Sequence, residues 1–199
     1  MSRPTEYQWV ITSTNYDADP AKFARWLRFD GVDDYLDLPY MGLYANGSAS
    51  VVMCGRIPTP ITTVRYGLAE RNTINSSQIY SPVRLVAIDL LNSRIRDDTG
   101  TDILSTPQKT ITRDTFVFTS IDTGSNVIIS HNGALFSSTA YTRTSATYNN
   151  TTIGAGVWSS VEYFFAGDIY SLIITKSALT DAQRIKCERF LAQKSGVML

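Results

Sequence analysis

The chain has 199 residues, of which 43% are hydrophobic, and its 18 basic and 18 acidic side chains give a net charge of zero. This length and hydrophobic content fit one folded domain and exclude a disordered chain. The balanced charge gives no electrostatic reason to expect nucleic acid as a partner. No apolar run reaches the ~18 residues that a membrane span needs, so we expect no membrane partner either.

The N-terminal stretch, residues 1–22, is predicted to form an arm that precedes a folded domain spanning residues 23–199. Tyr7, Trp9 and Ile11 alternate along this arm in the manner of a strand. An extended segment of this kind can add a strand to the edge of a neighbour's sheet. We therefore expect these three residues to form a docking arm.

From residue 23 to residue 175 the chain has the period-two pattern of β-strands. Short apolar and β-branched runs alternate with turn residues, which is typical of an all-β sandwich. Residues 139–152 are predicted to form a long loop, and residues 94–98 a solvated turn. The predicted strands are Phe23–Phe29, Tyr35–Leu38, Ser48–Arg56, Thr63–Ala69, Val83–Leu91, Thr115–Ile121, Asn126–Ser130, Thr151–Ile153, Val161–Phe165 and Ile169–Thr175.

Two turn signals shape the middle of the chain. Asn132-Gly133 stands between two apolar runs, and both residues tolerate the positive φ of a tight hairpin turn. Asp122–Ser125 forms a second turn signal just upstream. Together they predict a three-stranded meander from Thr115 to Ser138.

The pattern changes to a helical period near the C-terminus. Thr180 and Gln183 form a capping box, and Gly196 can close the helix that they begin. We predict a helix over Thr180–Lys194. The spacing places Ile185 and Phe190 on one side with Ala182, which predicts that this side is buried.

Two stretches of sequence resemble the laminin-G-like jelly rolls of the concanavalin A-like lectin/glucanase superfamily. Trp26–Leu36 resembles their opening hairpin, and Ala166–Gln183 resembles their closing strand and the short helix after it. Val127–Leu135 and Thr151–Ala155 resemble inner strands in the same order. The resemblance covers residues 23 to 194 and implies a two-sheet antiparallel jelly-roll sandwich with one short C-terminal α-helix.

The opening hairpin holds an acidic turn, Asp30–Asp34. Turn chemistry alone explains it, because glycine supplies a positive φ and Asp side chains accept from turn amides. The resemblance offers a second reading, a structural calcium ion between the first hairpin and the last strand. The matching positions are Gly31, Asp33 and Asp168. Apart from this calcium, we expect no cofactor.

The sequence contains no recognisable catalytic set, and we expect no enzymatic activity. The four glutamates are Glu6, Glu70, Glu162 and Glu188, and none belongs to the Glu-x-Asp-x-x-Glu pattern of related glucanases. The chain has one histidine, His131, and lacks a Gly-x-Ser-x-Gly nucleophile elbow. The surfaces of the fold must then act by binding.

Glycan binding and protein docking are both compatible with this sequence. Sugars are bound by aromatic faces together with planar polar side chains. The candidate ligand-binding residues are Tyr66, Arg71, Asp89, Trp158 and Tyr163, for which packing between sheets or an oligomer contact is the alternative.

Free-standing laminin-G-like domains that start at their own Met are similar to many bacteriophage structural proteins. This family context implies a non-enzymatic virion protein, either a capsid decoration or a tail or fibre component. It would be made in the host cytoplasm, because Met1 leads into no apolar signal segment. Its expected partners are other virion proteins, further copies of itself and a host-surface glycan. The alternative is a carbohydrate-binding or adhesion module of a bacterial protein.

Overall fold

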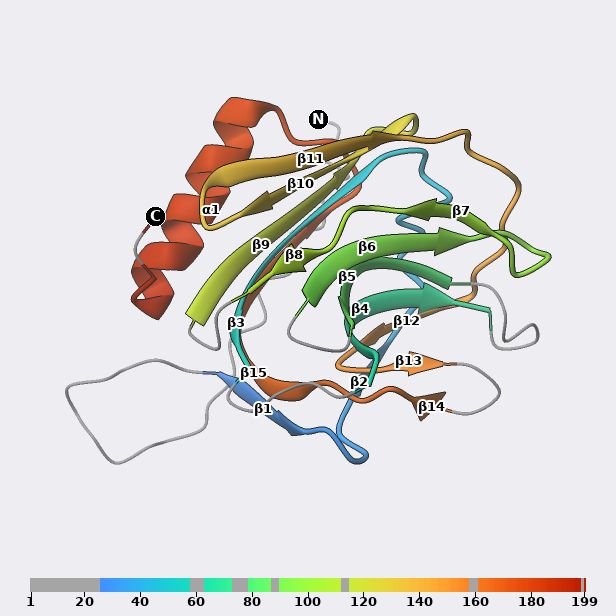
Figure 1. The fold of residues 1–199 in the computed structure, drawn as a ribbon. Coiled ribbons are helices and arrows are strands. Elements are labelled where there is room, and N and C mark those ends of the chain that lie inside the picture. The colour runs from blue at the N-terminus through green and yellow to red at the C-terminus, as the bar shows by residue number, and fades with distance from the viewer. Residues whose placement is uncertain are drawn as a thin grey trace, which may run out of the picture.

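The computed structural model describes residues 26–57, 63–72, 79–86, 90–111, 115–157, 161–197 and 199. Two antiparallel sheets face each other as a sandwich, as expected from the sequence (Figure 1). In spatial order, the strands of sheet A are β1 (Leu27–Asp30), β15 (Ala166–Thr175), β3 (Ala49–Arg56), β9 (Thr115–Asp122), β10 (Asn126–His131) and β11 (Ala134–Ala140).

Sheet B is the second layer, and its strands come largely from the middle of the chain. In spatial order they are β2 (Leu36–Leu38), β12 (Asn150–Ile153), β4 (Arg65–Arg71), β5 (Ile79–Val86), β6 (Leu90–Arg96) and β7 (Asp102–Ser105), and β8 (Lys109–Thr110) also pairs with β6. A small hairpin, β13 (Gly156–Val157) and β14 (Val161–Glu162), follows β12.

The hydrophobic core lies between the two sheets. Met53 and Phe118 from sheet A and Leu68 and Leu85 from sheet B belong to one fully buried cluster. Burying a side chain of this size contributes roughly 1.5–3 kcal/mol, so this layer supplies most of the driving force for folding.

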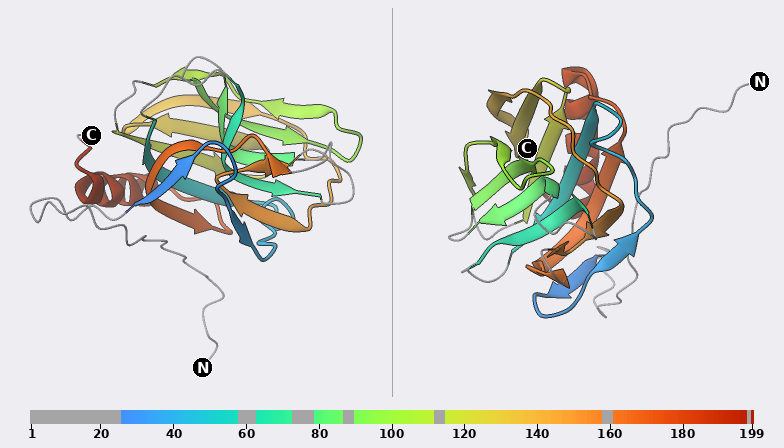
Figure 2. Two further views of the ribbon diagram at one scale, coloured as in Figure 1. Left: turned by 90° about the horizontal axis from the view of Figure 1, so that it is seen from below. Right: turned by 90° about the vertical axis from the view of Figure 1, so that its right-hand side faces the viewer.

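Strand β15 is apolar on both faces because both faces are covered. Leu172 and Ile174 join the core between the sheets, whereas Ile173 packs in a second cluster with Val52 and Leu191. This second cluster lies under the helix α1 (Asp181–Ser195), which packs on the side of sheet A that faces away from sheet B (Figure 2). The predicted strand Ile169–Thr175 thus lies within β15.

The ends of α1 are as predicted, but its buried side is not. The Thr180 side chain accepts from the amide of Gln183, the Gln183 side chain accepts from the amide of Thr180, and Gly196 ends the helix with a φ of 72°. The residues buried against sheet A are Arg184, Glu188, Leu191 and Ala192, whereas Phe190 is 44% exposed. The prediction that Phe190 is buried is wrong, because an internal ion pair allows charged residues to occupy the contact face.

The structure also corrects two strand assignments. The predicted strand Val83–Leu91 is two antiparallel strands, β5 and β6, and Arg94 and Arg96 lie within β6 rather than in a solvated turn. The predicted meander of β9, β10 and β11 is confirmed. The predicted arm, with Tyr7, Trp9 and Ile11, lies outside the described residues and stays a prediction. Within the part of the chain that the structure describes, no helix has the length and apolar character to cross a bilayer.

Candidate functional site

The outer face of sheet B carries a cluster of arginine and tyrosine side chains, and β6 contributes two of them. Ile95 lies in the core, and the Ser93 hydroxyl lies 2.8 Å from that of Ser120 on the opposite sheet, so these residues point inward. Because successive strand residues point to opposite faces, Arg94 and Arg96 point outward.

The two neighbouring strands extend the cluster across the sheet. Tyr66 on β4 pairs in register with Arg84 on β5, and Arg84 pairs with Asn92 on β6. Residues directly opposite each other in an antiparallel pair share a face. Tyr66 and Arg84 therefore lie on the same outer face as Arg94 and Arg96.

The β13–β14 hairpin covers one end of this face. A Cβ atom on Gly156 would lie 2.2 Å from the ring of Tyr66, so only glycine lets the hairpin pack this closely. The backbone amide of Tyr66 donates to the carbonyl of Tyr163, and the two tyrosine rings meet edge to face with centroids 5.9 Å apart. Tyr163 holds a positive φ of 57°, a backbone conformation that non-glycine residues seldom adopt.

We name this group the outer-face site, and it consists of Tyr66, Arg84, Arg94, Arg96, Asp102 and Tyr163. The Asp102 carboxylate accepts from Arg94 at 2.7 and 2.6 Å and from Arg96 at 2.8 Å. Partial burial raises the pKa of Asp102, but the hydrogen bonds and positive charges of these two arginines outweigh burial, so the net effect is a lowered pKa. Burial raises the pKa of Tyr66, against the opposing charge of the three arginines.

The sequence predicted part of this site. Tyr66 is 2% exposed and Tyr163 is half-buried, and the structure brings these two predicted residues together. Arg71 is placed elsewhere, where its Nε donates to Asn150 at 3.2 Å and its Nη2 lies 3.8 Å from Asp37. The other two predicted ligand residues, Asp89 and Trp158, lie outside the described residues and stay predictions.

None of the three arginines of the site was predicted from the sequence. Arg94 and Arg96 were assigned to a turn, although their spacing of two residues is the spacing of one strand face. The pairing of Arg84 with Tyr66 depends on the register between β4 and β5, which no local pattern encodes.

The positions predicted to bind calcium already have partners. The carbonyl oxygen of Gly31 accepts from Arg65 at 2.7 Å, and the buried carboxylate of Asp168 accepts from Arg28 at 2.8 Å. A cation at these oxygens would have to displace a guanidinium group, so this pair of oxygens does not fit an ion as it stands. Asp33 is exposed and lies within 4.8 Å of Asp30 and Asp34, an arrangement that the turn itself explains.

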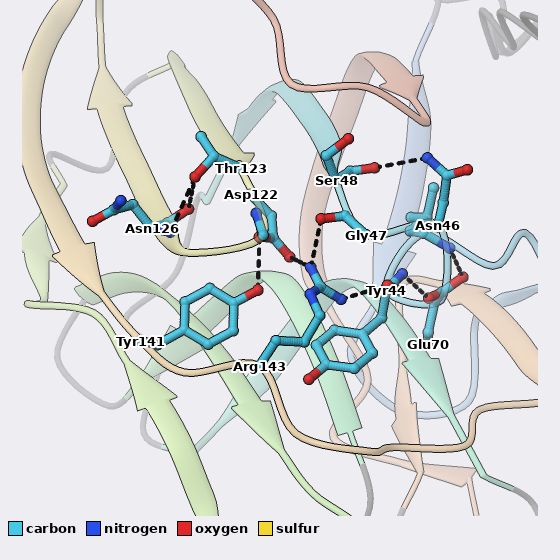
Figure 3. Close-up of polar contacts among 12 residues, drawn as sticks. Tyr44, Asn46, Gly47, Ser48, Glu70, Asp122, Thr123, Asn126, Tyr141 and Arg143 are labelled. Carbon is cyan, nitrogen blue, oxygen red and sulfur yellow. Dashed lines mark hydrogen bonds and ion pairs between the residues drawn. The ribbon is translucent and has the colours of Figure 1, made fainter.

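A second polar cluster lies at the loops that join the sheets, and most of its polar groups bond to one another (Figure 3). The buried carboxylate of Asp122 accepts from Arg143 and from the Tyr141 hydroxyl, both at 2.8 Å. Arg143 also donates to the carbonyls of Tyr44 and Gly47, and its guanidinium lies 4.1 Å from the centre of the Tyr44 ring. These bonds fix the loops and leave the charged groups little capacity for a ligand.

The buried glutamates serve the fold in the same way. Glu70 is fully buried and accepts from the amides of Leu43 and Tyr44 at 2.8 and 2.9 Å. Burial raises the pKa of Glu70, although these amide bonds oppose the rise. Glu188 is held by Arg184, 2.6 Å away. Neither carboxylate is placed to act as the acid or base of a glycosidase pair, which must flank a sugar.

Comparisons with known proteins bear on the fold. No protein-family model matches the chain, and no curated protein matches its sequence. Solved structures do match. The carbohydrate-binding module CBM40 of the Ruminococcus gnavus IT-sialidase, bound to α2,3-sialyllactose, is 12% identical with a TM-score of 0.64, and the match covers 83% of this chain and 98% of that chain. The fold is a lectin-like jelly roll.

Two longer proteins contain a similar unit. The NanB sialidase of Streptococcus pneumoniae is 15% identical with a TM-score of 0.63, and the match covers 80% of this chain but only 27% of NanB. A structure that describes the interaction of botulinum neurotoxin type C with two ganglioside molecules is 12% identical with a TM-score of 0.64, covering 92% of this chain and 47% of that chain. At these identities the likeness establishes the jelly-roll fold alone.

Proposed function

We propose that the protein is a non-catalytic glycan-binding module and that its outer-face site holds the sugar. The observation that carries the proposal is the grouping of Tyr163 with Arg94, Arg96 and Asp102 on one face. Sugars present C–H faces that pack on aromatic rings and hydroxyls that need planar hydrogen-bonding groups, and this site offers both. Asp102 keeps 41% of its side chain exposed, so the polar part of the site is open to a ligand.

The similar structures support this reading of the fold. The CBM40 domain matches over nearly its whole length and is bound to a sialylated sugar, and the neurotoxin structure concerns gangliosides. Since NanB matches over only 27% of its length, its hydrolytic activity is no guide to this chain. Glu70 and Glu188, the two described buried glutamates, are held by bonds within the protein, which agrees with a module that binds a sugar without cleaving it.

The alternative reading from the sequence, a glycan-binding module, thus has more support than the virion role. The similar structures described above provide no link to a virion. The bacteriophage context, the docking arm and self-association stay predictions, and a glycan-binding protein at a host surface would satisfy both readings.

A glycan array with the purified protein tests the proposal. We expect specific binding that Tyr163→Ala weakens at least about fivefold, the loss typical of a contact residue at a binding site. Tyr40→Ala is the matched control, because Tyr40 is 38% exposed and lies outside the outer-face site. If the protein binds none of the glycans, or if both variants bind like the wild type, the outer-face site is not a glycan site.

A further inference from the structure

Arg84 is a buried cation that lacks a counter-ion among the described residues. It is only 9% exposed, and among these residues no carboxylate forms an ion pair with it. Its guanidinium donates to the neutral hydroxyl of Tyr66, but its Nε has no hydrogen-bond partner. Burial therefore lowers the pKa of Arg84, and the nearby positive charge of Arg94 adds to this effect.

A buried charge without a counter-ion is costly, and native proteins seldom keep one without a reason. Arg143 provides the comparison within this chain. Its Nε also lacks a partner, but its two terminal nitrogens bind Asp122, Tyr44 and Gly47. Arg143 is thus a neutralised structural arginine, whereas Arg84 is a donor whose charge is not met within the described part of the chain.

The residues of the outer-face site around Arg84 carry more positive than negative charge. Arg94 and Arg96 both bind the carboxylate of Asp102, and the charges of all three guanidinium groups act on the hydroxyl of Tyr66. Among the six residues of the outer-face site, three are positively charged and one is negatively charged, and the donor Arg84 at their centre is nine-tenths buried. The free-energy cost of removing a negative group from water would be small here, because charge-assisted hydrogen bonds to the arginines would replace its hydration.

We propose that the outer-face site takes a sugar that carries an oxyanion, a carboxylate or a sulfate, and that Arg84 is the donor that recognises it. The proposal rests on the proposed function, because it names the class of glycan for the same site. Arg84 donates to the oxyanion, Arg94 and Arg96 strengthen the attraction, and Tyr163 packs against the sugar ring.

The test compares glycans that differ only in charge. The probes are lactose, sialyllactose, the methyl ester of sialyllactose and sulfated lactose, titrated by calorimetry and placed on the array beside other neutral, sialylated, glucuronylated and sulfated pairs. We expect acidic members to bind about 10- to 100-fold more tightly than their neutral parents, the range for a charge-assisted bond. The sialylated and sulfated members separate the two sources of charge.

Variants then assign the effect to Arg84. We expect Arg84→Gln to remove most of the preference for acidic glycans, whereas Arg189→Gln, an exposed arginine on α1, leaves it unchanged. If Arg84→Gln does not fold, wild-type binding still tests the oxyanion proposal. The uncharged methyl ester must then bind more weakly than sialyllactose, and sialyllactose itself must bind more weakly as salt is added.

The outcomes separate the two proposals. Binding to neutral glycans with no gain from an acidic group overturns the oxyanion proposal and leaves the glycan-binding function in place. A preference for acidic glycans that persists in Arg84→Gln also overturns the role of Arg84. Absence of binding across acidic and neutral glycans overturns both proposals.

Discussion

Removal of Arg184 should destabilise the protein through the buried face of α1. Its Nη1 lies 2.6 Å from Glu188, and the two side chains are 5% and 1% exposed. Glu188 also accepts from Thr119 at 2.7 Å and from Ser130, which anchors it to sheet A. Arg184→Met would leave the Glu188 carboxylate buried without its cation, a change that typically costs about 3–5 kcal/mol. We expect a loss of this size in the free energy of unfolding, measured by urea denaturation.

The matched control on the same helix is Phe190→Ala. Because Phe190 is 44% exposed, we expect its loss to cost under about 1 kcal/mol. A double variant, Arg184→Met with Glu188→Leu, should recover much of the lost stability, since it removes both charges together. An unchanged denaturation midpoint in Arg184→Met, or a cost of about 3–5 kcal/mol for Phe190→Ala, would refute this account of the helix interface.

Three further predictions concern single groups. Burial and the nearby Lys109 lower the pKa of His131, so the unfolded chain binds the proton first and stability should fall as the pH drops below about 6.5. His131→Gln should lose this part of the pH dependence in urea denaturation at several pH values, and a profile identical to the wild type would contradict it. Cys54 is buried in the cluster under α1, and this burial raises its pKa to about 11. Iodoacetamide at neutral pH should therefore label the partly buried Cys187 well before Cys54, and equal rates would argue against this packing of Cys54. Since guanidinium groups occupy two of the three positions predicted to bind calcium, we expect millimolar calcium and then EDTA to leave the melting temperature unchanged; a clear rise with calcium would restore the metal site.

Local patterns predicted much of the fold because they are set by short-range physics. The alternation in β9 and β10 and the capping box at Thr180 follow from which residues can point inward and which can bond a free amide. The hairpin of β5 and β6 was missed because Ala87 and Ile88 give no turn signal in the sequence.

Burial of charge explains the larger errors. A pattern places Arg184 and Glu188 on the solvent side of a helix, whereas the folded chain buries them as a pair. Arg84 is also a charged residue that the sequence suggests is exposed. The structure buries it on the outer face of sheet B, where it pairs in register with Tyr66. Cross-strand pairing is a property of the whole sheet, so the arginines of the site could not be found without the structure.

The location of a bound glycan is the most direct test of the central claim. We would record backbone and side-chain NMR shifts of the isotope-labelled protein while adding the glycan that binds best. The account predicts that the largest changes fall on the outer face of sheet B, at Tyr66, Arg84, Arg94 and Tyr163. Changes confined instead to the loop cluster around Tyr44 and Arg143, with the outer face unaffected, would contradict it.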